Sequence, residues 1–272
     1  MPAANFGSIT SRSEARLIPS RIRKVLSTMA ARQVRALLMG GQACVFYGAA
    51  EFSRDTDLLV LLSSENLPRL TGALNDLHAE CVAVPPFMSE YLERGHAVHF
   101  RCHHPEAASM RVDIMSKLRG VDDFEIVWER RTSLSDQDGT TYDLLSLPDL
   151  VRAKKTQRNK DWPMLQRLLE AHYLGHRQSS TEEQRRFWLR ELRTPELLVE
   201  VAQTWPQLAM EMAPNRPLLA FAVAAKLSEL ESALLAEERD EREQDRLYWK
   251  PLRAELEKLR HAVRKPMPPT HG

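Results

Sequence analysis

The chain has 272 residues, with 38 Lys plus Arg against 37 Asp plus Glu, so its formal net charge is only +1. This balance excludes a globally basic surface of the kind that binds long nucleic acids, and leaves room only for a local basic patch. Hydrophobic residues make up 43% of the sequence, which is enough for the core of one large domain or of two domains of ordinary size.

The spacing of the three cysteines and the polar N-terminus both favour a cytoplasmic location. Cys44, Cys81 and Cys102 are odd in number and widely spaced, and no CxxC pair is present. This pattern argues against a zinc ribbon or a disulfide framework and fits a reducing compartment. No apolar run is long enough to span a bilayer, and residues 1–16 lack the apolar segment of a secretory signal. The sequence therefore predicts a cytoplasmic protein with no membrane partner.

The first predicted strand runs into a glycine turn. A helix is expected from Ser20 on, where apolar residues recur at helical spacing, and residues 34–38 are typical of a strand. The strand ends at Gly40-Gly41, and a second helix is expected over residues 42–49. A glycine turn at a helix N-terminus leaves backbone N–H groups free, which favours the binding of phosphate.

A pair of carboxylates opens the next predicted strand, residues 55–62. Asp55 and Asp57 are separated by one residue, and side chains two positions apart on a strand point to the same face. Two neighbouring carboxylates are costly unless a cation neutralises their charge. The pair therefore indicates a site for a divalent metal ion.

A third carboxylate lies on a later strand. Residues 97–102 and 110–115 alternate between apolar and polar side chains, which predicts a hairpin. Asp113 stands in the second of these strands between apolar neighbours, where a carboxylate requires a partner. A metal cluster shared with Asp55 and Asp57 would supply that partner.

The second half of the chain changes from mixed to helical character. A further hairpin is predicted over residues 132–145, because Asp138-Gly139 is a strong turn signal. Two helices follow, and Asp161 is expected to cap the second of them. After that helix no convincing strand occurs. Prolines divide the remaining chain into helices, and Pro251 is expected to begin or kink the last one.

These elements predict a two-part chain of the α/β (α+β) class. The expected parts are a flexible leader over residues 1–15, a domain with a mixed sheet flanked by helices over 16–178, an all-helical domain over 179–265 and a disordered tail over 266–272. We expect the helical part to close over a cleft of the first part or to contact a protein partner.

The arrangement of these motifs resembles a known superfamily. Gly40-Gly41, a gap of thirteen residues, an Asp-x-Asp pair and a third Asp on a later strand resemble the DNA polymerase beta-type nucleotidyltransferases. Residues 150–161, LVRAKKTQRNKD, resemble the helix after the sheet in small bacterial members. These members include the minimal nucleotidyltransferases and the toxin-type enzymes of abortive-infection and toxin–antitoxin systems. The resemblance covers roughly residues 20–175.

The resemblance implies a metal-dependent reaction. Asp55 and Asp57 would hold a Mg²⁺ that bridges them to the phosphates of a nucleoside triphosphate (NTP). Asp113 and the same pair would hold a second Mg²⁺ that activates the acceptor hydroxyl. The implied nucleotide-binding residues are Gly40, Gly41, Gln42, Lys154 and Arg158. Of these, one of the two cationic side chains would neutralise the departing pyrophosphate.

The implied function is transfer of a nucleoside monophosphate to a hydroxyl with release of pyrophosphate, in a setting such as toxin–antitoxin or defence. The acceptor stays open between RNA, a protein side chain and a small molecule. A second hypothesis is a non-catalytic binding module that keeps the fold and forms one half of a toxin–antitoxin or regulatory pair. Glu51 motivates it, because small relatives usually carry an arginine four residues before the first aspartate.

Overall fold

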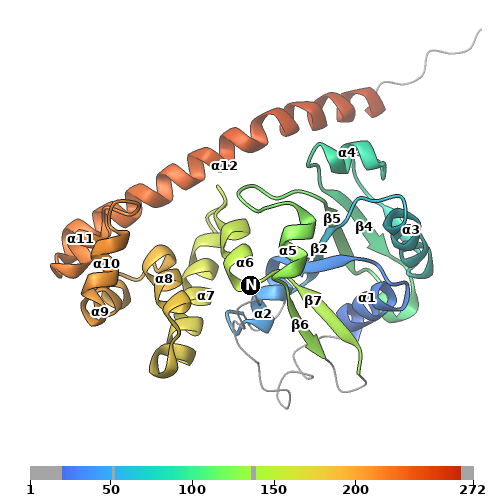
Figure 1. Ribbon diagram of the computed structural model, residues 1–272. Helices are drawn as coiled ribbons and strands as arrows, with labels where there is room; N and C mark the ends of the chain where they lie inside the picture. Colours follow the sequence, from blue (N-terminus) through green and yellow to red (C-terminus); the bar gives the residue numbers. More distant parts are fainter. Residues whose placement is uncertain (1–19, 51–52, 136–138, 265–272) are drawn as a thin grey trace, which may run out of the picture.

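The computed structural model describes residues 20–50, 53–135 and 139–264. The expected leader and tail, Glu51 and residues 136–138 of the predicted turn lie outside these ranges. The described part has a mixed α/β architecture, in which a seven-stranded sheet with flanking helices precedes a helical region (Figure 1). This confirms the predicted fold class at the level of its architecture.

Seven strands form one mixed sheet. Their bounds are β1 Ala36–Met39, β2 Asp55–Val60, β3 Ala79–Cys81, β4 Val98–Cys102, β5 Arg111–Met115, β6 Thr132–Ser135 and β7 Thr141–Leu144. Across the sheet the order is β3-β4-β5-β2-β1-β7-β6. Strand β2 is antiparallel to β1 and parallel to β5. The sheet thus places side by side the two strands that carry the three predicted carboxylates.

One face of β2 belongs to the hydrophobic core. Leu58 pairs with Leu38 of β1 and with Ile114 of β5, and all three side chains are buried. Because side chains alternate along a strand, Asp55 and Asp57 point to the opposite face. The alternation of side chains along β2 therefore places both carboxylates on the face opposite Leu58.

Helices cover the sheet and form the second half of the chain. Their bounds are α1 Ser20–Ala31, α2 Gly40–Phe46, α3 Asn66–Asp76, α4 Ser89–Glu93, α5 Phe124–Glu129, α6 Leu147–Lys154, α7 Asp161–His176, α8 Glu182–Glu191, α9 Pro195–Thr204, α10 Pro206–Met212, α11 Leu219–Val223 and α12 Leu227–Arg264. Helix α2 packs on β1, β2 and α6, whereas α1 packs on β2, β7 and α3. Every described helix is too short or too polar to span a lipid bilayer.

The 38-residue helix α12 contacts both halves of the chain (Figure 1). It begins beside α9 and α11, where Leu230 and Leu234 are buried. Toward its other end it reaches the segment between α4 and β4, where Glu255 forms 2.8 Å ion pairs with Arg94 and His96. The helix thus spans the distance from the helical region to the sheet.

The structure also tests the predicted element bounds. Both predicted hairpins are confirmed, since β4 pairs antiparallel with β5 and β6 with β7. Of the two alternatives for Pro251, the start of a new helix is wrong, because α12 continues through this residue. A proline in a helix removes one backbone hydrogen bond. Here the helix is anchored on both sides of that position, by Asp245, which accepts a hydrogen bond from the backbone of Gln157, and by Glu255, which contacts His96.

A buried histidine joins α7 to α8 and makes stability depend on pH. Trp188 Nε1 donates a 2.9 Å hydrogen bond to Nδ1 of His172, and the His172 ring stacks on His176. Burial, with a smaller contribution from His176, lowers the pKa of His172 to about 3. The unfolded chain, with an ordinary histidine pKa of about 6.5, therefore binds more protons between these values.

We expect this histidine to cost stability at acidic pH. In the wild type the contribution is fully present above pH 6.5 and falls by about 1.4 kcal/mol per pH unit toward pH 3. His172→Asn keeps an acceptor for Trp188 and removes the titration, so its free energy of unfolding should fall less steeply over this range. Urea denaturation at several pH values measures both slopes. Parallel slopes would contradict the assignment.

Candidate functional site

The predicted carboxylates come together on one face of the sheet. Asp57 of β2 pairs in register with Asp113 of β5, and Asp113 pairs in turn with His99 of β4. Side chains in register on neighbouring strands point to the same face. Asp55, two residues before Asp57, shares that face. The sequence predicted the three aspartates but not the histidine.

Asp57 lies in the most perturbed environment of the three. Burial, followed by the negative charges of Asp113 and Asp55, raises its pKa to about 6, while Lys154 and Arg158 act in the opposite direction. The Asp57 carboxylate is therefore largely buried and lies near two other negative charges. It is also close enough to both predicted phosphate-binding cations for their charges to act on it.

Asp113 already has cationic and hydrogen-bonding partners. Its Oδ1 accepts a 2.7 Å hydrogen bond from Arg111 Nε and lies 2.9 Å from His99 Nδ1. Burial alone would raise the pKa of Asp113, but the contacts with His99 and Arg111 outweigh it and hold the pKa below its usual value. The sequence could have predicted the contact of Arg111 with Asp113, because Arg111 lies two residues before Asp113 on the same strand. It could not have predicted the contact of His99, because that contact depends on the register of β4 against β5.

The glycine turn lies directly against Asp57. Gly40 has φ +68°, a conformation that L side chains rarely adopt, and a Cβ at this position would stand 1.9 Å from Asp57 Oδ2. A Cβ on Gly41 would stand 2.9 Å from Ser53 Oγ. The need for glycine is thus set by the approach of the backbone to the carboxylate. Helix α2 begins at Gly40 itself and has seven residues, so its expected phosphate seat stays a prediction.

Gln42 is the third residue of this turn. Its side chain is fully buried, and neither its amide oxygen nor its amide nitrogen has a hydrogen-bond partner within the described part of the chain. A buried amide without partners is unfavourable and calls for an explanation.

Lys154 and Arg158 converge on a buried carboxylate that the sequence analysis assigned differently. Asp161 accepts from Lys154 Nζ at 3.3 Å, from Thr156 Oγ1 at 2.6 Å and from Arg158 Nε at 2.8 Å. The expected capping role is wrong, because the N-cap of α7 is Lys160 and no side-chain cap bond forms there. Although burial opposes it, these contacts keep the pKa of Asp161 below its usual value.

A buried cysteine links these groups to the glycine turn. Burial raises the pKa of Cys44, on α2, to about 11, and the charges of Lys154, Asp161 and Asp57 also act on it. Helix α2 packs on α6, whose last residue is Lys154. The predicted residues on β2, α2 and α6 therefore belong to one neighbourhood.

The predicted two-ion arrangement stays a prediction. Among the described residues, no group of three or more His, Cys, Asp or Glu side chains is arranged so that it could hold a metal ion. The comparisons with known proteins supply no family either. No protein-family model matches the chain, and a search of curated proteins finds no match.

Proposed function

We propose that the chain is a Mg²⁺-dependent nucleotidyltransferase, which transfers a nucleoside monophosphate from an NTP to a hydroxyl acceptor and releases pyrophosphate. The observation that carries this proposal is the in-register pair Asp57 and Asp113 on parallel neighbouring strands. Asp55 extends the pair along the same face of β2. Three carboxylates on one sheet face are an arrangement that folding alone does not favour.

The residues on this face fit a magnesium site by their chemistry. Magnesium prefers oxygen ligands and is bound through a few carboxylates together with substrate phosphates. Asp55 and Asp57 would hold one ion, and Asp113 would share a second ion with them. Arg111 and His99 both contact Oδ1 of Asp113, so its Oδ2 would be the oxygen left for an ion. Gly40 leaves the space beside Asp57 free of a side chain.

In the proposed reaction the acceptor oxygen attacks the α-phosphorus, the bond from that phosphorus to the bridging oxygen breaks, and pyrophosphate leaves with the electron pair. The acceptor proton passes to solvent. Bound Mg²⁺ would stabilise charge on the attacking and leaving oxygens. Lys154 and Arg158 would stabilise the negative charge on pyrophosphate. Asp161 holds both cations beside the site.

A second candidate is the non-catalytic binding module. The contacts of Asp113 with Arg111 and His99 favour it, because they neutralise one carboxylate without any ion. Such a protein would bind a nucleotide at the same face and transfer nothing.

Transfer of label separates these two candidates. The purified protein is incubated with Mg²⁺, each α-labelled NTP and, in turn, total cell RNA, total cell protein and small-molecule hydroxyl acceptors. We expect a labelled product and free pyrophosphate, both lost in Asp57→Asn. Asp123→Asn is the matched control, because this aspartate is exposed and makes no side-chain cap bond at α5. Nucleotide binding without transfer to any acceptor would favour the binding module.

A further inference from the structure

The segment that connects α6 to α7 has two faces, and they contact different parts of the molecule. The side chains of Lys154, the last residue of α6, and of Thr156 and Arg158 in the connecting segment all contact the carboxylate of Asp161. The side chains of the residues between and after these, Lys155, Gln157 and Asn159, contact other partners.

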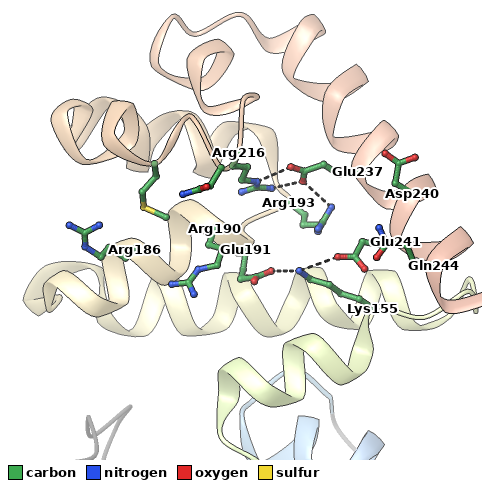
Figure 2. A pocket seen from close by; sticks show the side chains of 12 residues that line it. Lys155, Arg186, Arg190, Glu191, Arg193, Arg216, Glu237, Asp240, Glu241 and Gln244 are labelled. Carbon is green, nitrogen blue, oxygen red and sulfur yellow. Dashed lines mark hydrogen bonds and ion pairs between the residues drawn. The ribbon is translucent and has the colours of Figure 1, made fainter. Parts of the chain in front are cut away.

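The odd-numbered side chains face the helical half. Lys155 Nζ forms ion pairs with Glu191 of α8 at 2.7 Å and with Glu241 of α12 at 3.6 Å (Figure 2). Asn159 accepts a hydrogen bond from Arg242 of α12. Lys155 also lines a cavity of about 600 Å³ between α8 and α12, so directed polar contacts, rather than close apolar packing, fix this side of the segment.

The central contact on this side is Asp245 of α12. Its carboxylate accepts from the backbone N–H of Gln157 at 2.9 Å, from the side-chain amide of Gln157 at 3.2 Å and from Trp249 Nε1 at 3.1 Å. Asp245 is only 2% exposed. It therefore fixes the backbone of the segment at Gln157, directly before Arg158.

An arginine connects Asp245 to other residues of this contact region. Arg119, in the connection between β5 and α5, lies 3.3 Å from Asp245 and donates hydrogen bonds to Glu241 and to the carbonyl oxygen of Lys155. The carboxylate of Asp245 is thus paired and hydrogen-bonded, as a buried charge requires. The same arginine links α12 to the chain that follows β5, the strand of Asp113.

We propose that Asp245 is a positioning residue that sets Lys154 and Arg158 against the phosphates of the nucleotide, so that α12 completes a site whose carboxylates lie on the sheet. This inference rests on the proposed function. Asp245 touches no substrate in this assignment and acts through the segment alone. Its loss therefore lowers affinity for the phosphates more than it lowers the rate at saturating substrate.

The test compares Asp245→Asn with Asp240→Asn, an exposed aspartate on the same helix. Transfer kinetics give KM for the NTP and kcat, and calorimetry gives the Kd of magnesium pyrophosphate. We expect Asp245→Asn to raise both KM and Kd about 10-fold or more, with a smaller change in kcat, because displaced binding groups lose their substrate contacts. Asp240→Asn should match the wild type.

A milder variant keeps the test decisive if Asp245→Asn folds poorly. Gln157→Ala removes the side-chain bond and retains the backbone bond to Asp245, so KM and Kd should rise in the same direction by less. Unchanged KM and Kd in folded Asp245→Asn and in Gln157→Ala, beside an active wild type, would overturn this inference alone. A wild type that neither transfers label nor binds magnesium pyrophosphate would overturn the proposed function, and this inference with it.

Discussion

Asp57→Asn is expected to stabilise the metal-free protein by about 3 kcal/mol at pH 8 while lowering nucleotide transfer about 10³-fold or more. Burial and the charges of Asp113 and Asp55 raise the pKa of Asp57 to about 6, and each pKa unit corresponds to about 1.4 kcal/mol. The rate falls because an ion that stabilises the reacting oxygens loses a ligand.

The sign of the stability effect follows from proton binding. The folded carboxyl binds a proton more tightly than the unfolded one, so the wild type loses stability as the pH rises from about 4 to about 6 and stays at its lower value above that. Urea denaturation in EDTA should therefore show an advantage of Asp57→Asn that grows over this range.

Magnesium provides the complementary measurement. Added Mg²⁺ should raise the free energy of unfolding of the wild type and leave that of Asp57→Asn unchanged, since a ligand stabilises only the protein that binds it. Equal stability of the two proteins at pH 8 in EDTA would show that burial and the neighbouring charges do not destabilise the ionised Asp57 carboxylate.

Gly40→Ala is expected to damage both the fold and the site. An alanine in the left-handed region costs about 1–2 kcal/mol. The added Cβ would also overlap the Asp57 carboxylate, at 1.9 Å from Oδ2, which adds about 1–3 kcal/mol of overpacking. If Asp57 shifts by about 1 Å to relieve the overlap, transfer should fall about 100-fold.

Gly48→Ala is the matched control for the glycine turn. Gly48 has φ +74°, and a Cβ there would meet nothing within 4 Å, so alanine carries the conformational cost without the overlap. Thermal denaturation and transfer assays on both variants therefore isolate the contact with Asp57. Equal destabilisation of the two variants, with full activity in Gly40→Ala, would contradict a functional role for this close approach.

Local pattern was enough to predict the parts of the site that lie on single strands. Asp55 and Asp57 share a face because side chains alternate along β2, and Asp113 stood out because its neighbours are apolar. The strand pairing that sets Asp57 beside Asp113 links residues far apart in the sequence. Periodicity does not report the order or direction of strands, so their contact could be expected only from the need of Asp113 for a partner and from the family resemblance.

The remaining partners depend on packing between distant segments. His99 reaches Asp113 only through the register of β4 against β5. Asp161 resembled a helix cap by its position, and its contacts with Lys154 and Arg158 require the intervening chain to turn back on itself. Asp245 lies in a charged run that is typical of an exposed helix face, and its burial follows from the path of α12.

Helix α12 is the last helix in the described part of the chain, so Asp245 is synthesised after the other residues of the proposed site. All three aspartates, both cations and Asp161 leave the ribosome well before Asp245 does. During synthesis the incomplete chain holds the proposed chemical groups but not the helix that orders the segment between α6 and α7. Under the proposed assignment, tight binding of the nucleotide is gained only when most of the chain has been translated.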